Sequence, residues 1–117
     1  MIKEVAFVAY SVKDVPRAVA FYRDVIGLKP GDMVSDHWAE FDIAGTTFGV
    51  GNGESIGIAP GSQQSAAFEV DDIAAERERL VTHGVEVTDI WDSPVCRGCF
   101  ATDPDGNRIA LHQRKQQ

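Results

Sequence analysis

The sequence predicts an α+β fold made of two copies of one unit, each running strand, helix, strand, strand, strand. The first observation is a repeated hairpin. Within residues 99–112, the turn Asp103–Gly106 separates two alternating apolar segments, and Gly106 can accept the positive φ that such a turn needs. Asp42 and Gly45 occupy the same two places in residues 38–50, at an offset of 61 residues in each case. A hairpin repeated in a short chain indicates an internal duplication.

The predicted helix starts repeat as well. At an offset of 58 residues, three residues of the first half match three of the second: Val12, Asp14 and Val15 against Val70, Asp72 and Ile73. Aspartate is a favoured helix cap, and a glycine follows each predicted helix at Gly27 and Gly84, as is typical of helix ends. The two halves therefore share their helices and their hairpins.

The elements of the first half follow from apolar spacing. We expect a buried strand at Val5–Val12, a helix between Asp14 and Gly27 with an apolar stripe, a short strand within 28–34, and hairpin strands at His37–Ile43 and Thr46–Gly51. Residues 51–65 are rich in glycine and serine, which predicts a linker.

The second half is predicted in the same way. We expect a strand at Ser65–Val70, a helix from Asp72 to Gly84, a strand at Val85–Ile90, a loop at Trp91–Pro94, a hairpin that starts with the strand Cys96–Thr102, and a frayed tail at 114–117. Each unit then has a half-open sheet that needs covering, so the two sheets are expected to join around a common concavity.

Composition excludes several classes of protein. The net charge of −7 disfavours nucleic acid or an anionic membrane as partner, and no apolar run has the length of a membrane helix. The start of the chain has no secretory signal pattern, and two cysteines do not make a disulfide framework. We therefore expect a cytoplasmic protein with a small-molecule partner.

Three segments together resemble the vicinal oxygen chelate superfamily, which includes glyoxalase I, extradiol dioxygenases and bleomycin-resistance proteins. They are residues 12–15 with 21–28, residues 68–73, and residues 103–107. The resemblance implies a single domain over 1–117, with βαβββ modules at about 1–53 and 64–114 joined by the linker 51–65. It also implies a cupped, mixed eight-stranded sheet, a ligand site in the cup, and often a homodimer.

The resemblance also places four metal-ligand positions, one on the first and one on the last strand of each module. In this sequence they fall on Phe7, Gly49, Ser65 and Ala110. Phe, Gly and Ala side chains carry no donor atom, and divalent cations need several strong ligands. The usual metal site is therefore predicted to be absent, and no cofactor is expected.

Period-two alternation predicts which residues line the cup instead. If Thr102 and Asn107 close the second hairpin, its facing pairs on that surface are Arg97 with His112, Cys99 with Ala110, and Ala101 with Arg108. In the first hairpin, Trp38 is expected to face Gly49 and Glu40 to face Thr47. A one-residue slip would invert either assignment.

Each lining residue has a functional and a structural interpretation. Trp38 and Phe7 could form an aromatic wall for a ligand, or fill the cup as core. Glu40 could bind a cationic group or act as a base, or it could be a solvated residue or the partner of Arg97 or Arg108. Arg108 itself could clamp an anion or lie on the surface.

The cysteines and His112 also have more than one interpretation. His112 could be a base or a replacement metal ligand, or simply structural. Cys99, if exposed to the cup, could be a nucleophile beside His112, whereas Cys96 is most simply buried packing. Residues three apart in a strand point to opposite faces, so a Cys96–Cys99 disulfide is not expected.

The leading hypothesis is a metal-free small-molecule binding protein similar to the bleomycin-resistance branch, with a flat, partly apolar ligand in the cup. The alternative is an enzyme, a glyoxalase-like lyase or isomerase or a dioxygenase relative, with relocated ligands such as Glu40 and His112. A third possibility is a dimerising module whose cup is plugged by Trp38 and Phe7.

Overall fold

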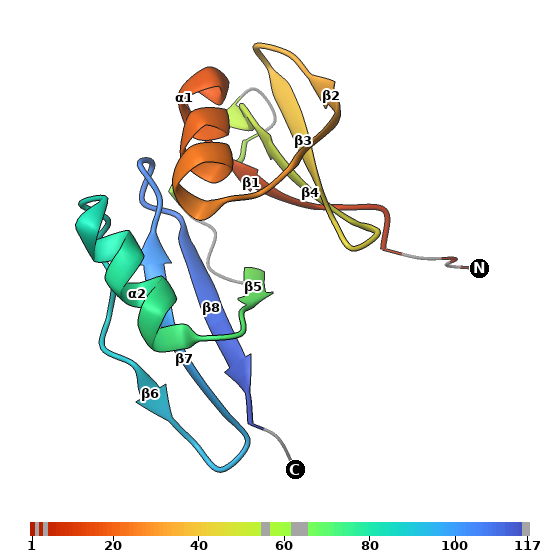
Figure 1. The fold of residues 1–117 in the computed structure, drawn as a ribbon. Helices are drawn as coiled ribbons and strands as arrows, with labels where there is room; N and C mark the ends of the chain where they lie inside the picture. The colour runs from red at the N-terminus through yellow and green to blue at the C-terminus, as the bar shows by residue number, and fades with distance from the viewer. Residues whose placement is uncertain (2, 4, 55–56, 62–65, 116–117) are drawn as a thin grey trace. The chain divides into compact units, whose positions relative to one another are not determined.

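The computed structural model describes residues 1–117 except 2, 4, 55–56, 62–65 and 116–117 (Figure 1). The chain divides into two compact units, Met1–Ser62 (unit 1) and Gln63–Gln117 (unit 2). In the described residues each unit has one four-stranded mixed sheet, with its own helix against one side of it. None of the described helices is both long enough and apolar enough to span a membrane.

The elements of unit 1 follow the predicted order: β1 (Val8–Ser11), α1 (Val15–Ala20), its π-helical continuation η1 (Phe21–Ile26), β2 (Pro30–Val34), β3 (Trp38–Ile43) and β4 (Thr46–Gly51). The strand order in the sheet is β1-β4-β3-β2, with β1 parallel to β4 and the other pairs antiparallel.

Unit 2 repeats this topology with β5 (Ala66–Glu69), α2 (Ile73–Thr82), β6 (Trp91–Asp92), β7 (Cys96–Thr102) and β8 (Arg108–Arg114). Its strand order is β5-β8-β7-β6, and β5 is parallel to β8. The matching orders confirm the α+β fold class and the βαβββ duplication predicted from the sequence.

The helix caps form as the sequence predicts. The Asp14 side chain accepts a hydrogen bond from the Arg17 N–H at 3.1 Å, and Asp72 accepts one from the Ala75 N–H at 3.1 Å. Gly27 has φ 95°, the left-handed conformation that favours glycine at a helix end. The N–H of Gly27 donates to the carbonyl of Tyr22, five residues earlier, which is the π-helical pattern of η1.

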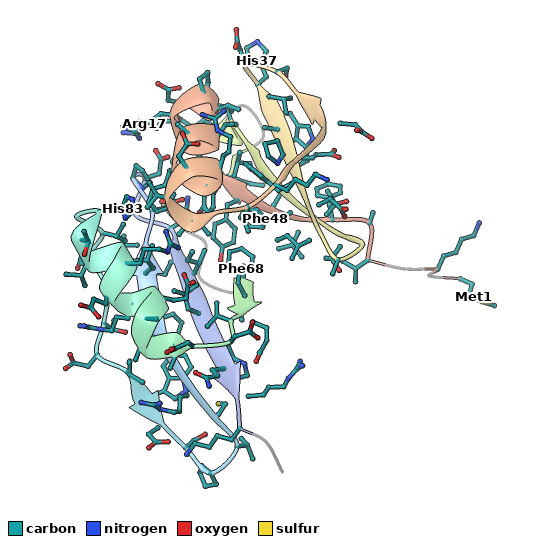
Figure 2. All side chains as sticks on the ribbon, in the orientation of Figure 1. Met1, Arg17, His37, Phe48, Phe68 and His83 are labelled. Carbon is teal, nitrogen blue, oxygen red and sulfur yellow. The ribbon has the colours of Figure 1, made fainter. Side chains whose placement is uncertain are left out.

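Each sheet buries the face that packs on its own helix. In unit 1 this face is aromatic, with ring contacts among Tyr10, Tyr22, Phe41 and Phe48, the last of them labelled in Figure 2. In unit 2 the corresponding face is smaller and mostly aliphatic, with Cys99, Ala101, Ile109 and Leu111 packed against α2, whose buried residues are Ile73 and Leu80. The opposite face of each sheet, called the open face below, carries the alternate residues of the strands.

The predicted strand at Val85–Ile90 is wrong. Among these residues only Val87 forms a β-bridge, with Ala101, and the strand β6 begins one residue later, inside the predicted loop Trp91–Pro94. Thr88 explains the interruption: its hydroxyl, rather than a backbone carbonyl, accepts the N–H of Phe100 at 2.9 Å. A side chain that replaces a backbone partner in this way interrupts the ladder.

The predicted register of the second hairpin is also wrong, by one residue. Cys99 lies opposite Leu111, and Ala110 lies opposite Phe100. The hairpin closes at Asp103 and Asn107, because the Asp103 N–H donates to the Asn107 carbonyl at 2.7 Å and the Asp103 carboxylate accepts two hydrogen bonds from Asn107. Three residues rather than four therefore form the loop.

The first hairpin is shifted by two residues from its predicted register. Trp38 lies opposite Gly51, and Glu40 lies opposite Gly49, because Ile43 and Thr46 pair across a two-residue turn. A shift of two keeps every side chain on its predicted face, whereas a shift of one reverses it. The open face of unit 1 is therefore the predicted one, and the assignments for the strands of the second hairpin need revision.

Candidate functional site

The open face of unit 1 is organised by Trp38 on β3. Its indole ring lies across two glycines of the neighbouring strand β4. A Cβ atom built on Gly49 would be 2.4 Å from Trp38 Cη2, and one built on Gly51 would be 2.6 Å from Trp38 Cε3. Any larger residue at either position would displace the ring, so the two glycines provide the space in which the indole lies against the strand.

Two neighbours fix the orientation of the Trp38 ring. Its Nε1–H donates to Glu40 Oε2 at 2.7 Å, and the ring of Phe7 meets it edge-on with centroids 5.2 Å apart. Phe7 keeps half of its surface exposed. Glu40 also lines a pocket of about 300 Å³ beside β2 and β3, together with residues such as Lys29, Asp32 and Thr47. An oriented aromatic ring thus stands next to a carboxylate that borders a polar pocket.

The open face of unit 2 has an aromatic group of its own. The ring of Trp91 lies against Gly98, where an added Cβ would be 2.3 Å from Trp91 Cζ2. Trp91 also contacts Phe100, with ring centroids 5.2 Å apart, and the guanidinium carbon of Arg108 stands 4.4 Å above the centre of the Phe100 ring. Arg108 therefore makes a cation–π contact rather than being an isolated surface charge.

His112 forms a polar link between β8 and β5. Its Nδ1 lies 2.6 Å from Glu69 Oε1, and the other oxygen of Glu69 accepts the N–H of Arg114 at 2.7 Å. The hydrogen bond to Glu69 raises the pKa of His112 above its usual value, and the same bond lowers the pKa of Glu69. The imidazole is thus held in one orientation and favoured in its charged form.

The structure sorts the predicted site residues into three groups. Those on an open face are Trp38, Glu40 and Gly49 in unit 1, with Phe7 against Trp38, and Arg108, Ala110 and His112 in unit 2. Arg97 and Cys99 lie on the face that packs on α2, contrary to prediction, because of the one-residue shift in register. Cys99 is fully buried there and is close enough to Arg77 of α2 to interact with its charge. Ser65 lies outside the described residues.

Sequence reasoning missed Glu69, Trp91, Cys96 and Phe100, which lie on the open face of unit 2. Phe100 lies opposite Ala110, in the position that was expected for Cys99, and Cys96 lies on the same face opposite Arg114. The available signal was the pair Asp103 and Asn107: had they been taken as the closing pair of the hairpin, alternation would have placed Cys96 and Phe100 beside His112 and Ala110.

The metal positions that the resemblance implies do not fit a metal ion at the three described residues. Phe7, Gly49 and Ala110 offer no donor atom, and Ser65 lies outside the described residues. Within the described part of the chain, no three His, Cys, Asp or Glu side chains are grouped so that they could hold a cation. Divalent cations in proteins are held by several such ligands, so this donor set does not match the group that the fold implies.

Comparisons with known proteins agree with this architecture. The crystal structure of TnmS3, an antibiotic binding protein from Streptomyces sp. CB03234, is 28% identical, with a TM-score of 0.83 over 97% of this chain and 98% of that one. A glyoxalase/bleomycin resistance protein from the same organism is 28% identical, with a TM-score of 0.80 over 94% and 100%. A superfamily member from Sphaerobacter thermophilus DSM 20745, at 24% identity and a TM-score of 0.81 over 96% and 98%, shares the fold.

No curated protein matches the chain in sequence. A family model, however, matches almost all of it. Residues 4–111 match the model described as "Glyoxalase/Bleomycin resistance protein/Dioxygenase superfamily". The match spans both units and includes the first of the repeated hairpins and almost all of the second, so the chain belongs to this superfamily.

Proposed function

We propose that the chain is a metal-free small-molecule binding protein of the glyoxalase/bleomycin-resistance type, which holds a flat, partly apolar ligand against Trp38. Two observations of different kinds support the proposal. One is the oriented indole of the open face of unit 1. The other is the similarity to TnmS3, itself described as an antibiotic binding protein, over 97% of this chain.

The position of Trp38 on Gly49 and Gly51 is the single observation that carries the proposal. A ring held flat by the strand and by Glu40 loses little further freedom when a ligand stacks on it, so less of the binding energy is lost to ordering. Aromatic stacking of this kind contributes about 0.5–1.5 kcal/mol beyond the area buried. The Glu40 carboxylate beside the ring favours ligands that carry a positive charge.

Binding of two planar probes tests this proposal. We expect proflavine, an aromatic cation, to bind saturably by fluorescence anisotropy, and anthracene-9-carboxylate, an aromatic anion, to bind more weakly. Trp38→Ala removes the stacking surface and should weaken proflavine binding about tenfold, whereas Trp38→Phe keeps a ring and should lose less. Glu40→Gln should weaken binding of the cation more than that of the anion.

A control variant and the contrary result make the test decisive. Val81→Ala alters an exposed apolar side chain on α2 and should leave the affinity for proflavine unchanged. Equal affinities in wild type and Trp38→Ala would refute the assigned surface. The metal-free part is tested by elemental analysis of protein purified without chelators: stoichiometric zinc, nickel or iron would overturn it and favour an enzyme.

The proposal includes a homodimer. In a single chain, several apolar side chains of unit 1 stay exposed, including Phe7 at 50% and Val34 at 54%. Apolar surface of this kind is stabilised when a second subunit covers it. The resemblance to a family that often forms homodimers points in the same direction.

A further inference from the structure

The thiol of Cys96 belongs to a polar cluster that the proposed ligand site does not use. Cys96 is the first residue of β7, is partly exposed, and lies opposite Arg114 of β8. Because Gly98 lies opposite His112, Cys96 and His112 are diagonal neighbours on the open face of unit 2, a distance that long side chains can span.

Three polar side chains lie on the same side of the sheet as the sulfur of Cys96. Ser93 Oγ lies 3.4 Å from Cys96 Sγ and donates its own proton to the Cys96 carbonyl at 3.0 Å, while Trp91 and His112 stand on the same open face as the thiol. The indole of Trp91 has one polar hydrogen and no acceptor, so towards the sulfur it can act only as a donor. Donation from the indole and from a protonated imidazole favours the anionic form of the thiol, which is the nucleophilic thiolate.

His112 is oriented for its contact with Cys96 by Glu69. Its Nδ1 is engaged by Glu69 Oε1 at 2.6 Å, so Nε2 is the nitrogen left to meet the thiol. Glu69 is itself fixed by the N–H of Arg114 at 2.7 Å. Nucleophile, base and orienting carboxylate thus come from three strands, β7, β8 and β5, in the arrangement that activates a cysteine.

The pKa values of Cys96 and His112 shift in the directions expected of an activated thiol. Interactions with Ser93, Trp91 and His112, in that order of effect, lower the pKa of Cys96 below its usual value, although burial acts against them. The pKa of His112 is raised, by Glu69 first and by Cys96 as well. Burial raises the pKa of Cys99, so the second cysteine of the chain has the opposite tendency.

We propose that Cys96 is a nucleophilic thiol that adds covalently to α,β-unsaturated carbonyl compounds reaching the open face of unit 2. The thiolate sulfur forms a bond to the β-carbon, and the π electron pair of the carbon–carbon double bond moves to the α-carbon through the enolate. The α-carbon then takes a proton from the imidazolium of His112. The product is a neutral thioether, and no oxidant or reductant is needed.

N-ethylmaleimide, a compound of this class, tests the proposal on the whole chain. At pH 6.5 a free thiol is about 1% thiolate, so an activated one stands out. Peptide mapping by mass spectrometry should find the adduct on Cys96, formed at least tenfold faster than on glutathione, while Cys99 stays unmodified until the chain is denatured. If N-ethylmaleimide modifies Cys96 no faster than it modifies glutathione, the proposal is overturned.

Variants separate activation from mere exposure. Cys96→Ser should abolish the fast reaction, and Cys99→Ser should leave its rate unchanged because that thiol faces α2. His112→Gln keeps a polar side chain but removes the imidazolium, and should slow the reaction about tenfold at pH 6.5. The rate of this variant should recover at pH 9, where any thiol ionises; a His112→Gln rate equal to wild type at pH 6.5 would contradict the proposed activation.

The pH profile of the reaction provides the second readout. The charged groups around the thiol are Glu69 of β5, His112 and Arg114 of β8, and the ion pair between Asp92 of β6 and Lys115. The midpoint of the rate should lie below that of a free thiol in wild type and should rise in His112→Gln. Because maleimide does not need to stack on Trp38, this proposal and the proposed ligand site can fail separately.

Discussion

Ala44 occupies a backbone conformation that alanine normally avoids. It has φ 51°, and among the described residues it is the one non-glycine residue with positive φ. With Gly45 at φ 88° it forms the two-residue turn between β3 and β4, and such turns need positive φ at both positions. The left-handed conformation costs an alanine about 1–2 kcal/mol, whereas asparagine tolerates it better.

Ala44→Asn should therefore raise the free energy of unfolding by about 1 kcal/mol. The measurement is urea denaturation followed by circular dichroism. Ala74→Asn is the matched control: Ala74 is an exposed residue within α2, where asparagine is a poorer helix former, and the change should destabilise slightly. A stability change of the same sign at both sites would show that the turn is not the cause.

Asp103 shows what residue patterns could and could not predict. The sequence indicated a turn at Asp103–Gly106, and the structure has one there. It did not indicate the register, because that depends on the Asp103 carboxylate accepting hydrogen bonds from Asn107 and from the N–H of Asp105. Each of these bonds is a choice between local partners that residue types alone leave open.

At the scale of elements, β5 and β8 are joined by the pair Glu69 and His112. The pair was not predictable, because its residues are 43 positions apart and the register of β8 was shifted. The helices, in contrast, were predictable, since Asp14, Asp72 and Gly27 act through bonds to residues close in sequence. The exceptions, η1 and the break at Thr88, arise from hydrogen bonds that compete with the regular ladder.

The Glu69–His112 pair should stabilise the fold most between about pH 4.5 and 6.5, the usual values of its two groups. The raised pKa of His112 gives stability that is full below 6.5 and is lost as pH rises through the raised value. The lowered pKa of Glu69 gives stability that is present above 4.5 and is lost as pH falls through the lowered value.

Melting temperatures from pH 4 to 9 would check this expectation. In a Cys96→Ser background, which removes the titration of the thiol, His112→Gln should lower the melting temperature most near pH 5.5 and least near pH 9. Arg23→Gln is a suitable control because its ion pair with Asp24 lies on η1 and involves no histidine. If the drop in melting temperature caused by His112→Gln instead grows towards pH 9, the assigned pair is contradicted.

At the scale of the whole molecule, the duplication was the most predictable property. It depends on spacings that recur, such as Asp14 with Asp72 and Asp42 with Asp103, and both halves have the same strand order. The candidate site was predictable only in the first hairpin, where the error in register was two residues and the side chains kept their predicted face. Trp38 and Glu40 were therefore placed correctly, whereas Arg97 and Cys99 of the second hairpin were not. A one-residue shift in register moves the side chains of a strand to the opposite face of the sheet without changing the topology.

The proposed homodimer gives a prediction at the same scale. Sedimentation equilibrium should yield a mass of twice 12.7 kDa at micromolar concentration. Phe7→Ser, which places a small polar side chain at an exposed aromatic position, should shift the equilibrium towards the monomer, whereas Val81→Ser on α2 should not. A wild-type mass of 12.7 kDa at all concentrations would exclude the dimer.

The two tryptophans each rest on glycines of their own sheet, Trp38 in unit 1 and Trp91 in unit 2. Because indole emission depends on its immediate surroundings, each half of the protein carries a separate optical reporter. When one tryptophan is replaced by phenylalanine, the fluorescence of the other reports on its own unit alone. The unfolding rates of unit 1 and unit 2 can then be measured separately and compared.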